Sequence, residues 1–198
     1  LLSKQIEQAQ KRVEGNNFDA RKTILAYDDV LREQREIIYK QRFEVIDAED
    51  GLTDIIMNMI RSSVERVVAS HTQGDDEENW NLNAIIEHVH ANLLDPDSIH
   101  VDELKGKDEE EIHELIMEKV EKAYEAKRAQ LEPEQFREFE KVILLRAVDS
   151  KWMDHIDQMD QLRQGIHLRA YGQTDPLREY QMEGFQMFEA MIEAIEDE

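Results

Sequence analysis

The stretch RQGIHLRAYGQTDP at residues 163–176 separates two long segments with helical apolar spacing, so it decides how the chain folds back on itself. Asp175 followed by Pro176 is typical of a helix start, because aspartate caps the first turn and proline fits the first helical position. We therefore predict a turn, with Tyr171 near its apex, between the two helices of an antiparallel hairpin. An aromatic side chain in a loop offers apolar area and a hydroxyl group to many peptide sequences.

The two flanking segments carry apolar stripes that can pack together. The first helix is predicted to begin near Glu132-Pro133, and the second at Pro176. Gly184 is expected to allow a close backbone approach in the second helix. The predicted stripes consist of Phe136, Phe139, Ile143, Ala147, Trp152, Ile156, Met159 and Ile166 in the first helix, and of Leu177, Tyr180, Gly184, Phe185, Phe188, Met191, Ile192 and Ile195 in the second.

Residues 2–46 have apolar positions at largely helical spacing and no proline, which predicts one long helix. At about 1.5 Å per residue such a helix reaches about 70 Å, so we expect it to span between other parts of a protein. Its weak point is Gly15-Asn16-Asn17, where the glycine costs on the order of 1 kcal/mol. A helix of this length needs partners along its apolar stripe.

The segment between the long helix and the hairpin is predicted to form a small bundle of shorter helices. A polar loop at residues 73–78 ends the first, and Asp95-Pro96 stops the second. Asp108 and Glu111 have the spacing of a capping box before the third. The apolar repeats of these helices cover residues 55–68, 82–93 and 112–124.

The composition favours an all-α protein of one to two domains. Of 198 residues, 40% are hydrophobic and 35% charged, whereas only 7 are glycine and 3 are proline, too few turn formers for many short strands. The absence of cysteine excludes a disulfide framework and a thiolate metal site. The sequence has no run of about 18 apolar residues, so it does not predict a transmembrane helix. The start at Leu1, with no methionine or signal-peptide pattern, leads us to expect a piece of a longer protein.

The net charge of -22 is unevenly distributed. Residues 1–47 carry nine acids and nine bases, residues 48–135 carry 23 and eight, and residues 136–198 carry 14 and seven. This acidity argues against nucleic-acid binding and against an anionic membrane surface, since both require Lys and Arg. Gln161–Arg178, with three arginines and one aspartate, is locally positive, which favours a negatively charged or unfolded target.

The sequence contains no motif that assigns a catalytic or cofactor-binding residue. No Gly-x-x-x-x-Gly-Lys-Ser/Thr loop is present, so we do not expect this segment to hydrolyse ATP by itself. The acid-x-x-His spacing at Glu87–His90, Asp97–His100 and Glu110–His113 is a partial match to a di-metal helical bundle. Chance alone gives about 1.6 such matches, and matching glutamates on two further helices are missing, so no metal site is assigned.

Three further polar features are interpreted as structural. His155 and His167 lie beside the apolar stripe of the hairpin and are expected to be hydrogen-bonded residues rather than acids or bases. The Asp28-Asp29 pair cannot converge on one ion, because adjacent helical residues point about 100° apart. We expect a salt bridge from this pair to Arg32 or Arg35.

Several blocks of the sequence resemble the SecA preprotein translocase family. Residues 162–169, LRQGIHLR, are similar to the tip of the family's two-helix finger. Residues 17–22, NFDARK, and 27–30, YDDV, are similar to its long scaffold helix, and the run from Leu144 to Trp152 also fits. The chain departs from the usual Gly-Tyr-Ala order at the tip. The resemblance covers the whole chain but only part of a much larger motor.

The resemblance implies three parts: a scaffold helix at residues 1–47, a helical wing at 48–132 and a two-helix finger at 133–198. In the family the finger tip contacts the translocating polypeptide and the channel, and the scaffold couples it to ATPase domains. ATP and magnesium belong to the parent motor. The implied contact residues are Leu168, Arg169, Ala170, Tyr171, Gly172 and Gln173.

The implied partners are the preprotein, the Sec channel and motor domains of the same chain, with a homodimer left open. The implied location is the cytoplasm, peripherally at the inner face of the cell membrane. Two alternatives from other classes remain at this point. One is a free-standing helical adaptor that joins partner proteins, and the other is the di-metal oxidoreductase.

Overall fold

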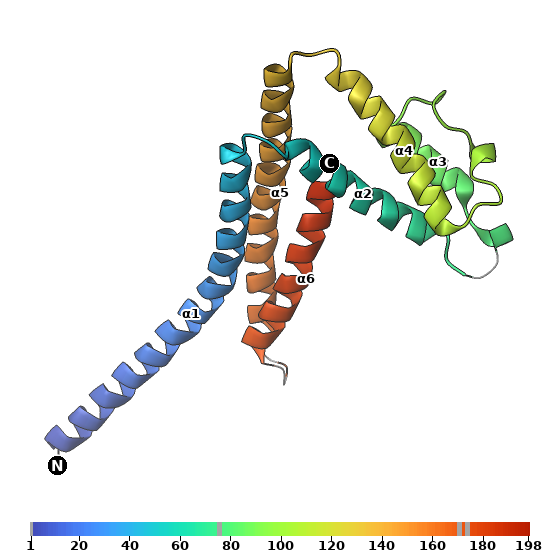
Figure 1. Ribbon diagram of the computed structural model, residues 1–198. Helices are drawn as coiled ribbons and strands as arrows, with labels where there is room; N and C mark the ends of the chain where they lie inside the picture. Colours follow the sequence, from blue (N-terminus) through green and yellow to red (C-terminus); the bar gives the residue numbers. More distant parts are fainter. Residues whose placement is uncertain (1, 75–76, 170–171, 173–174) are drawn as a thin grey trace. The chain divides into compact units, whose positions relative to one another are not determined.

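The computed structural model describes residues 2–74, 77–169, 172 and 175–198, and these residues form helices and connecting turns with no strand. Figure 1 shows their order along the chain. The predicted all-α class is confirmed. The elements are α1 (Leu2–Asp47), α2 (Leu52–His71), the 3-10 turn η1 (Glu77–Asn79), α3 (Leu82–Asn92), the 3-10 turn η2 (Val101–Glu103), α4 (Glu109–Arg128), α5 (Pro133–Arg169) and α6 (Pro176–Asp197).

The chain divides into two compact units by its internal packing. Unit 1 comprises residues 1–44 and 148–192, and unit 2 comprises residues 45–147 and 193–198. Unit 2 holds 30 acidic and 11 basic residues, a net charge of -19 out of the chain's -22. The compact units are defined by tertiary contacts. The three parts predicted from the sequence, residues 1–47, 48–132 and 133–198, were instead divided between predicted helices, and this division stays a prediction.

Helix boundaries follow from local capping chemistry. The predicted capping box before α4 is confirmed: the Glu111 backbone N–H donates to Asp108 Oδ1 at 2.8 Å, and the Asp108 N–H donates to Glu111 Oε2 at 3.0 Å. At α6 the Leu177 N–H donates to Asp175 Oδ1 at 3.1 Å, which confirms the predicted N-cap. Asn81 caps α3 in the same way, accepting from Ala84 N–H.

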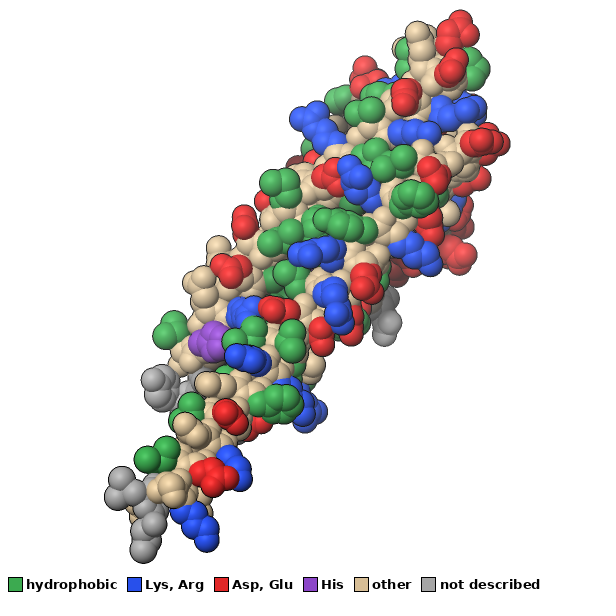
Figure 2. Space-filling view, turned by 90° about the vertical axis from the view of Figure 1, so that its left-hand side faces the viewer, with side chains coloured by type: hydrophobic (Ala, Val, Ile, Leu, Met, Phe, Trp, Pro, Cys, Tyr) green, Lys and Arg blue, Asp and Glu red, His purple; other side chains and the backbone are tan. Residues whose placement is uncertain are grey.

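α1 runs unbroken through Gly15, so the low helix propensity of this segment does not end the helix. All residues from 3 to 25 are exposed, and burial begins at Tyr27 and recurs at Gln34 and Ile38. The spacings of seven and four keep these three side chains on one helix face. Figure 2 shows hydrophobic side chains scattered among charged ones on the face it presents. The exposed half includes Ile6, Val13, Phe18, Ile24 and Leu25.

Unit 1 is a three-helix packing of α1, α5 and α6. Its core joins Tyr27 from α1, Met159, Leu162 and Ile166 from α5, and Tyr180 from α6. A methyl group added at Gly184 would lie 2.8 Å from Met159 Cε and 3.9 Å from Val30 Cγ1. α6 therefore comes close to side chains of both neighbours at Gly184, as expected for this glycine.

Unit 2 is built on the packing of α2 against α3 and α4. Its largest core cluster gathers aliphatic residues of these helices and of the loop after α3, including Val68, Ile85, Ile99, Leu104 and Ile116. The last residues of α6 belong to this unit. Arg66 of α2 pairs with Glu196 and Asp197, and Ser63 donates to Asp197 at 2.6 Å.

The buried stripe of α5 differs from the predicted one because it contains two polar residues. Phe139 is 49% exposed, and on α6 Phe185 is 59% exposed, although both were expected to face the core. The buried positions of α5 recur every three or four residues and include Glu140 and His155. Apolar periodicity alone cannot detect a stripe with polar members. These positions are Phe136, Glu140, Leu144, Ala147, Val148, Trp152, His155, Met159, Leu162 and Ile166.

We expect Gly15→Ala to increase the local stability of α1 by about 0.5–1 kcal/mol, because a helical glycine costs about this much relative to alanine. No atom lies within 4 Å of the added methyl group. Hydrogen exchange of the amides in residues 8–22 should slow accordingly. The matched control is Gly51→Ala. It should lower the free energy of unfolding, because Gly51 has a φ of 84°, a backbone conformation that alanine adopts only with strain. Faster exchange in Gly15→Ala would contradict the unbroken helix.

Candidate functional site: the end of the hairpin

The hairpin closes between Arg169, the last residue of α5, and Pro176, the first of α6. Of the turn itself, the structure describes Gly172, whose backbone N–H donates to the Arg169 carbonyl oxygen at 2.9 Å, and Asp175. Leu168 ends the apolar part of α5 and is 78% exposed. The end of α5 next to the turn thus presents a large apolar side chain to its surroundings.

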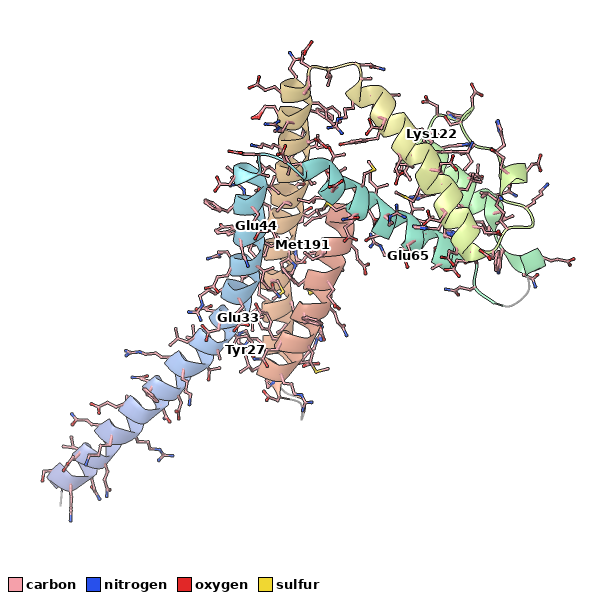
Figure 3. All side chains as sticks on the ribbon, in the orientation of Figure 1. Tyr27, Glu33, Glu44, Glu65, Lys122 and Met191 are labelled. Carbon is pink, nitrogen blue, oxygen red and sulfur yellow. The ribbon has the colours of Figure 1, made fainter. Side chains whose placement is uncertain are left out.

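An aromatic cluster lies beneath this end and fixes it to α1. The Tyr27 ring centroid lies 5.0 Å from that of Tyr180 and 5.8 Å from that of His167. In Figure 3, Tyr27 lies on α1 where the ends of α5 and α6 pass. Burial raises the pKa of the Tyr27 hydroxyl, Asp175 raises it further and Arg163 opposes the shift. Burial also raises the pKa of the Tyr180 hydroxyl, so both tyrosines are neutral at pH 7 and the cluster supports the turn by packing.

Ion pairs neutralise two of the three arginines that make this sequence segment positive. Arg163 Nη1 lies 2.9 Å from Asp28 Oδ1 of α1, and its guanidinium carbon lies 5.3 Å from the Tyr27 ring centroid. Arg169 Nη1 lies 2.7 Å from Glu183 and 3.6 Å from Glu179, both on α6. The hydrogen bond to Glu183 raises the pKa of Arg169.

The local net charge of +2 counted over Gln161–Arg178 is therefore offset by acidic side chains that lie nearby in the folded chain. Sequence counting missed Asp28 because it lies over a hundred residues away, and it missed the α6 glutamates because they fall just beyond the counted window. This end is consequently better suited to apolar and hydrogen-bonding contacts than to attraction of a polyanion.

A buried polar chain ties the three helices together farther from the turn. Gln34 Nε2 donates to the Gly184 carbonyl oxygen at 3.1 Å, and Gln34 Oε1 lies 2.6 Å from His155 Nε2. The His155 ring is flanked by those of Trp152 and Phe188. Burial lowers the pKa of His155. The prediction that this histidine is a hydrogen-bonded structural residue is confirmed.

A model of the SecA wing and scaffold domain matches residues 1–198, the whole chain. The chain belongs to this family. It therefore has a role in the SecA protein translocase, that is, in protein transport. In the described part of this SecA family chain, no helix combines the length and the apolar character needed to cross a bilayer.

The structure describes three of the six residues expected at the tip of the SecA finger. Leu168, Arg169 and Gly172 lie together at the end of the hairpin. Ala170, Tyr171 and Gln173 lie outside the described residues. Tyr27 and Asp28, which support this end from α1, were not assigned to the site from the sequence, although the YDDV block that contains them was one signal of the family.

Unit 2 of the SecA chain contains a groove of about 770 Å³, lined by α2 and α4. Arg61 in this groove is paired with Glu114 at 3.1 Å and Glu121 at 3.2 Å. Beside it, the buried Glu140 accepts from the hydroxyl groups of Thr53 and Tyr124 at 2.8 Å each. Burial, followed by the Glu140 hydrogen bond, raises the pKa of Tyr124. These charges and donors satisfy one another, so the groove gives no catalytic arrangement.

Two of the three histidines considered for a metal, His90 and His113, lie beside backbone carbonyl groups. His90 Nε2 is 2.8 Å from the Ile99 carbonyl oxygen, and His113 Nε2 is 3.3 Å from that of Arg61. Across residues 2–74, 77–169, 172 and 175–198, no three His, Asp or Glu residues gather around a shared point. Asp29 pairs with Arg32 at 3.0 Å, as expected.

The Arg163–Asp28 pair is expected to contribute a coupling energy of about 0.5–1 kcal/mol, because the pair is only partly exposed and the guanidinium also faces Tyr27. A double-mutant cycle with Asp28→Asn and Arg163→Gln, measured by urea unfolding, tests this value. The exposed Glu118–Lys122 pair on α4 serves as control, and its coupling energy should be smaller. Equal coupling in both cycles would contradict a special role for Arg163.

His155 should make the stability depend on pH below neutrality. Its folded-state pKa is lowered, so near and below pH about 6.5 the unfolded chain binds a proton that the folded chain does not. The free energy of unfolding should therefore fall as pH decreases towards the folded-state value, by up to about 1.4 kcal/mol per pH unit. Urea unfolding between pH 7.5 and 5.5 should show this extra loss in the natural chain relative to His155→Gln. Parallel curves would refute it.

Proposed function

We propose that this chain is the mechanical and regulatory module of an ATP-driven preprotein translocase. In this proposal the hairpin end contacts the translocating polypeptide and the Sec channel, while α1 links the hairpin to motor domains of the same protein. The observation that carries it is the whole-chain match to the SecA wing and scaffold domain, together with an exposed Leu168 at the end of a firmly packed hairpin.

The packing of unit 1 supports a hairpin that moves as one body with α1. The end of α5 is held by the Tyr27 cluster and by the Arg163–Asp28 pair, and farther along by the Gln34 hydrogen bonds. Contacts of this kind resist bending, so a displacement of α1 would displace the turn as well. An apolar side chain on a stiff support can press against an extended polypeptide without selecting its sequence.

The exposed half of α1 supports attachment to other domains. Residues 3–25 are exposed and carry five large apolar side chains. An isolated helix gains little stability from propensity alone, and most helices in proteins are stabilised by tertiary packing. We assign these contacts to the motor domains.

In this proposal, ATP is hydrolysed by the motor domains and not by the residues of this chain. The sequence has no glycine-rich loop with the Lys and Ser/Thr that would hold phosphates and magnesium, so its residues do not fit that ligand. The module's contribution is to restrain hydrolysis until a channel and a substrate are engaged. The proposed place of action is the cytoplasmic face of the membrane, with peripheral attachment.

A photo-crosslinking amino acid placed at position 168 or 171 of the full-length protein should form adducts with a secretory substrate stalled during translocation. Position 186, exposed on α6, is the control and should give several-fold fewer adducts. Exclusive adducts with a folded partner protein would instead favour the free-standing adaptor. Equal yields at 168, 171 and 186 would contradict a specific contact at the hairpin end.

A further inference from the structure

The centre of unit 1 contains a polar connection where apolar packing would be expected. Gln34 of α1 is 7% exposed and His155 of α5 is 2% exposed. Their side chains meet at 2.6 Å, and Gln34 also reaches the backbone of α6 at Gly184. One glutamine thus bonds to both helices of the hairpin at once.

The direction of each hydrogen bond is fixed by the Gly184 carbonyl group. A carbonyl oxygen can only accept, so the Gln34 amide nitrogen must face it and Gln34 Oε1 must face His155. His155 therefore donates from Nε2, and its Nδ1 is the unprotonated nitrogen. Nδ1 has no hydrogen-bond partner among the described residues.

The arrangement tolerates no shift of one helical turn. If α1 moved by four residues, Val30 or Ile38 would take the place of Gln34 opposite His155, and neither side chain can accept a hydrogen bond. A buried donor without a partner costs about 1–3 kcal/mol. If only apolar side chains met at this point, their packing after a shift of four residues would be nearly as favourable.

We propose that the hydrogen-bond chain His155–Gln34–Gly184 is a register lock, which selects one alignment of the hairpin along α1 rather than supplying net stability. A buried polar group is most useful where it makes competing alignments worse, as single polar residues do in coiled coils. Gln34 and His155 are therefore positioning residues. The inference rests on the packing of unit 1 alone and would hold whatever the hairpin contacts.

The register lock makes different predictions from a simple stabilising contact. Changing one partner alone leaves the other buried and unpaired, so Gln34→Leu and His155→Leu should each lower the unfolding midpoint. The double variant Gln34→Leu/His155→Leu should recover at least part of that loss, because both polar groups are gone. Its alignment, however, should no longer be unique.

Pulsed electron spin resonance can measure the alignment directly. The chain has no cysteine, so Lys40→Cys on α1 and Arg178→Cys on α6 give two unique and exposed label sites in unit 1. Lys40 lies six residues beyond Gln34 and Arg178 six residues before Gly184, an offset of about 18 Å along the helices at about 1.5 Å per residue, so sliding of α1 changes the distance between the labels. The otherwise natural chain should show one narrow distance. The double leucine variant should show a broadened distribution or a second distance that differs by up to about 5 Å, the length of one helical turn.

Two further variants separate alignment from stability. His155→Gln places an amide N–H at the same number of bonds from the backbone, so it should keep the single narrow distance. The exposed pair Gln41→Leu/Gln158→Leu should also keep it. The proposal is overturned if the double leucine variant retains the natural distance, if it fails to fold, or if His155→Gln broadens the distribution equally.

Discussion

The structure of unit 1 depends on a short buried segment of α1, from Tyr27 to Ile38, against which both helices of the hairpin pack. Two antiparallel helices alone bury little apolar surface, and a third helix gives each of them a second neighbour. The same segment supplies the aromatic base for the turn, the Asp28 partner of Arg163 and the Gln34 amide. Each of these contacts joins residues over a hundred positions apart in the chain.

This constraint explains why α1 has two halves with different surroundings. From Tyr27 onward one face of the helix is buried, at Tyr27, Gln34 and Ile38, whereas all residues from 3 to 25 are exposed although they include large apolar side chains. The helix is continuous across the change. The boundary is set by where the hairpin ends and not by any change in the helix itself. A SecA family member that links a hairpin to motor domains would need such an uncovered half.

Charge is organised by the same tertiary contacts. Arg163 and Arg169 near the turn are neutralised by acids of α1 and α6, while unit 2 holds -19 of the chain's -22. A like-signed surface of this size opposes association with polyanions. The end of α5 exposes Leu168 beside these ion pairs, which agrees better with the proposed polypeptide contact than with binding of a phosphate or a nucleic acid.

The sequence by itself determined the class and order of the helices, because helix periodicity, the Asp108–Glu111 capping box, Asp175-Pro176 and Pro133 act through neighbours only a few residues away. It also determined the family, through blocks such as LRQGIHLR and YDDV. Tertiary structure decided which faces are buried. Glu140 and His155 are polar by sequence, yet both are buried, with the Thr53 hydroxyl bonded to Glu140 and the Gln34 amide bonded to His155 Nε2, while Phe139 and Phe185 are left exposed. It also decided the charge of the hairpin end. Both outcomes depend on pairing between remote segments, which local patterns do not encode.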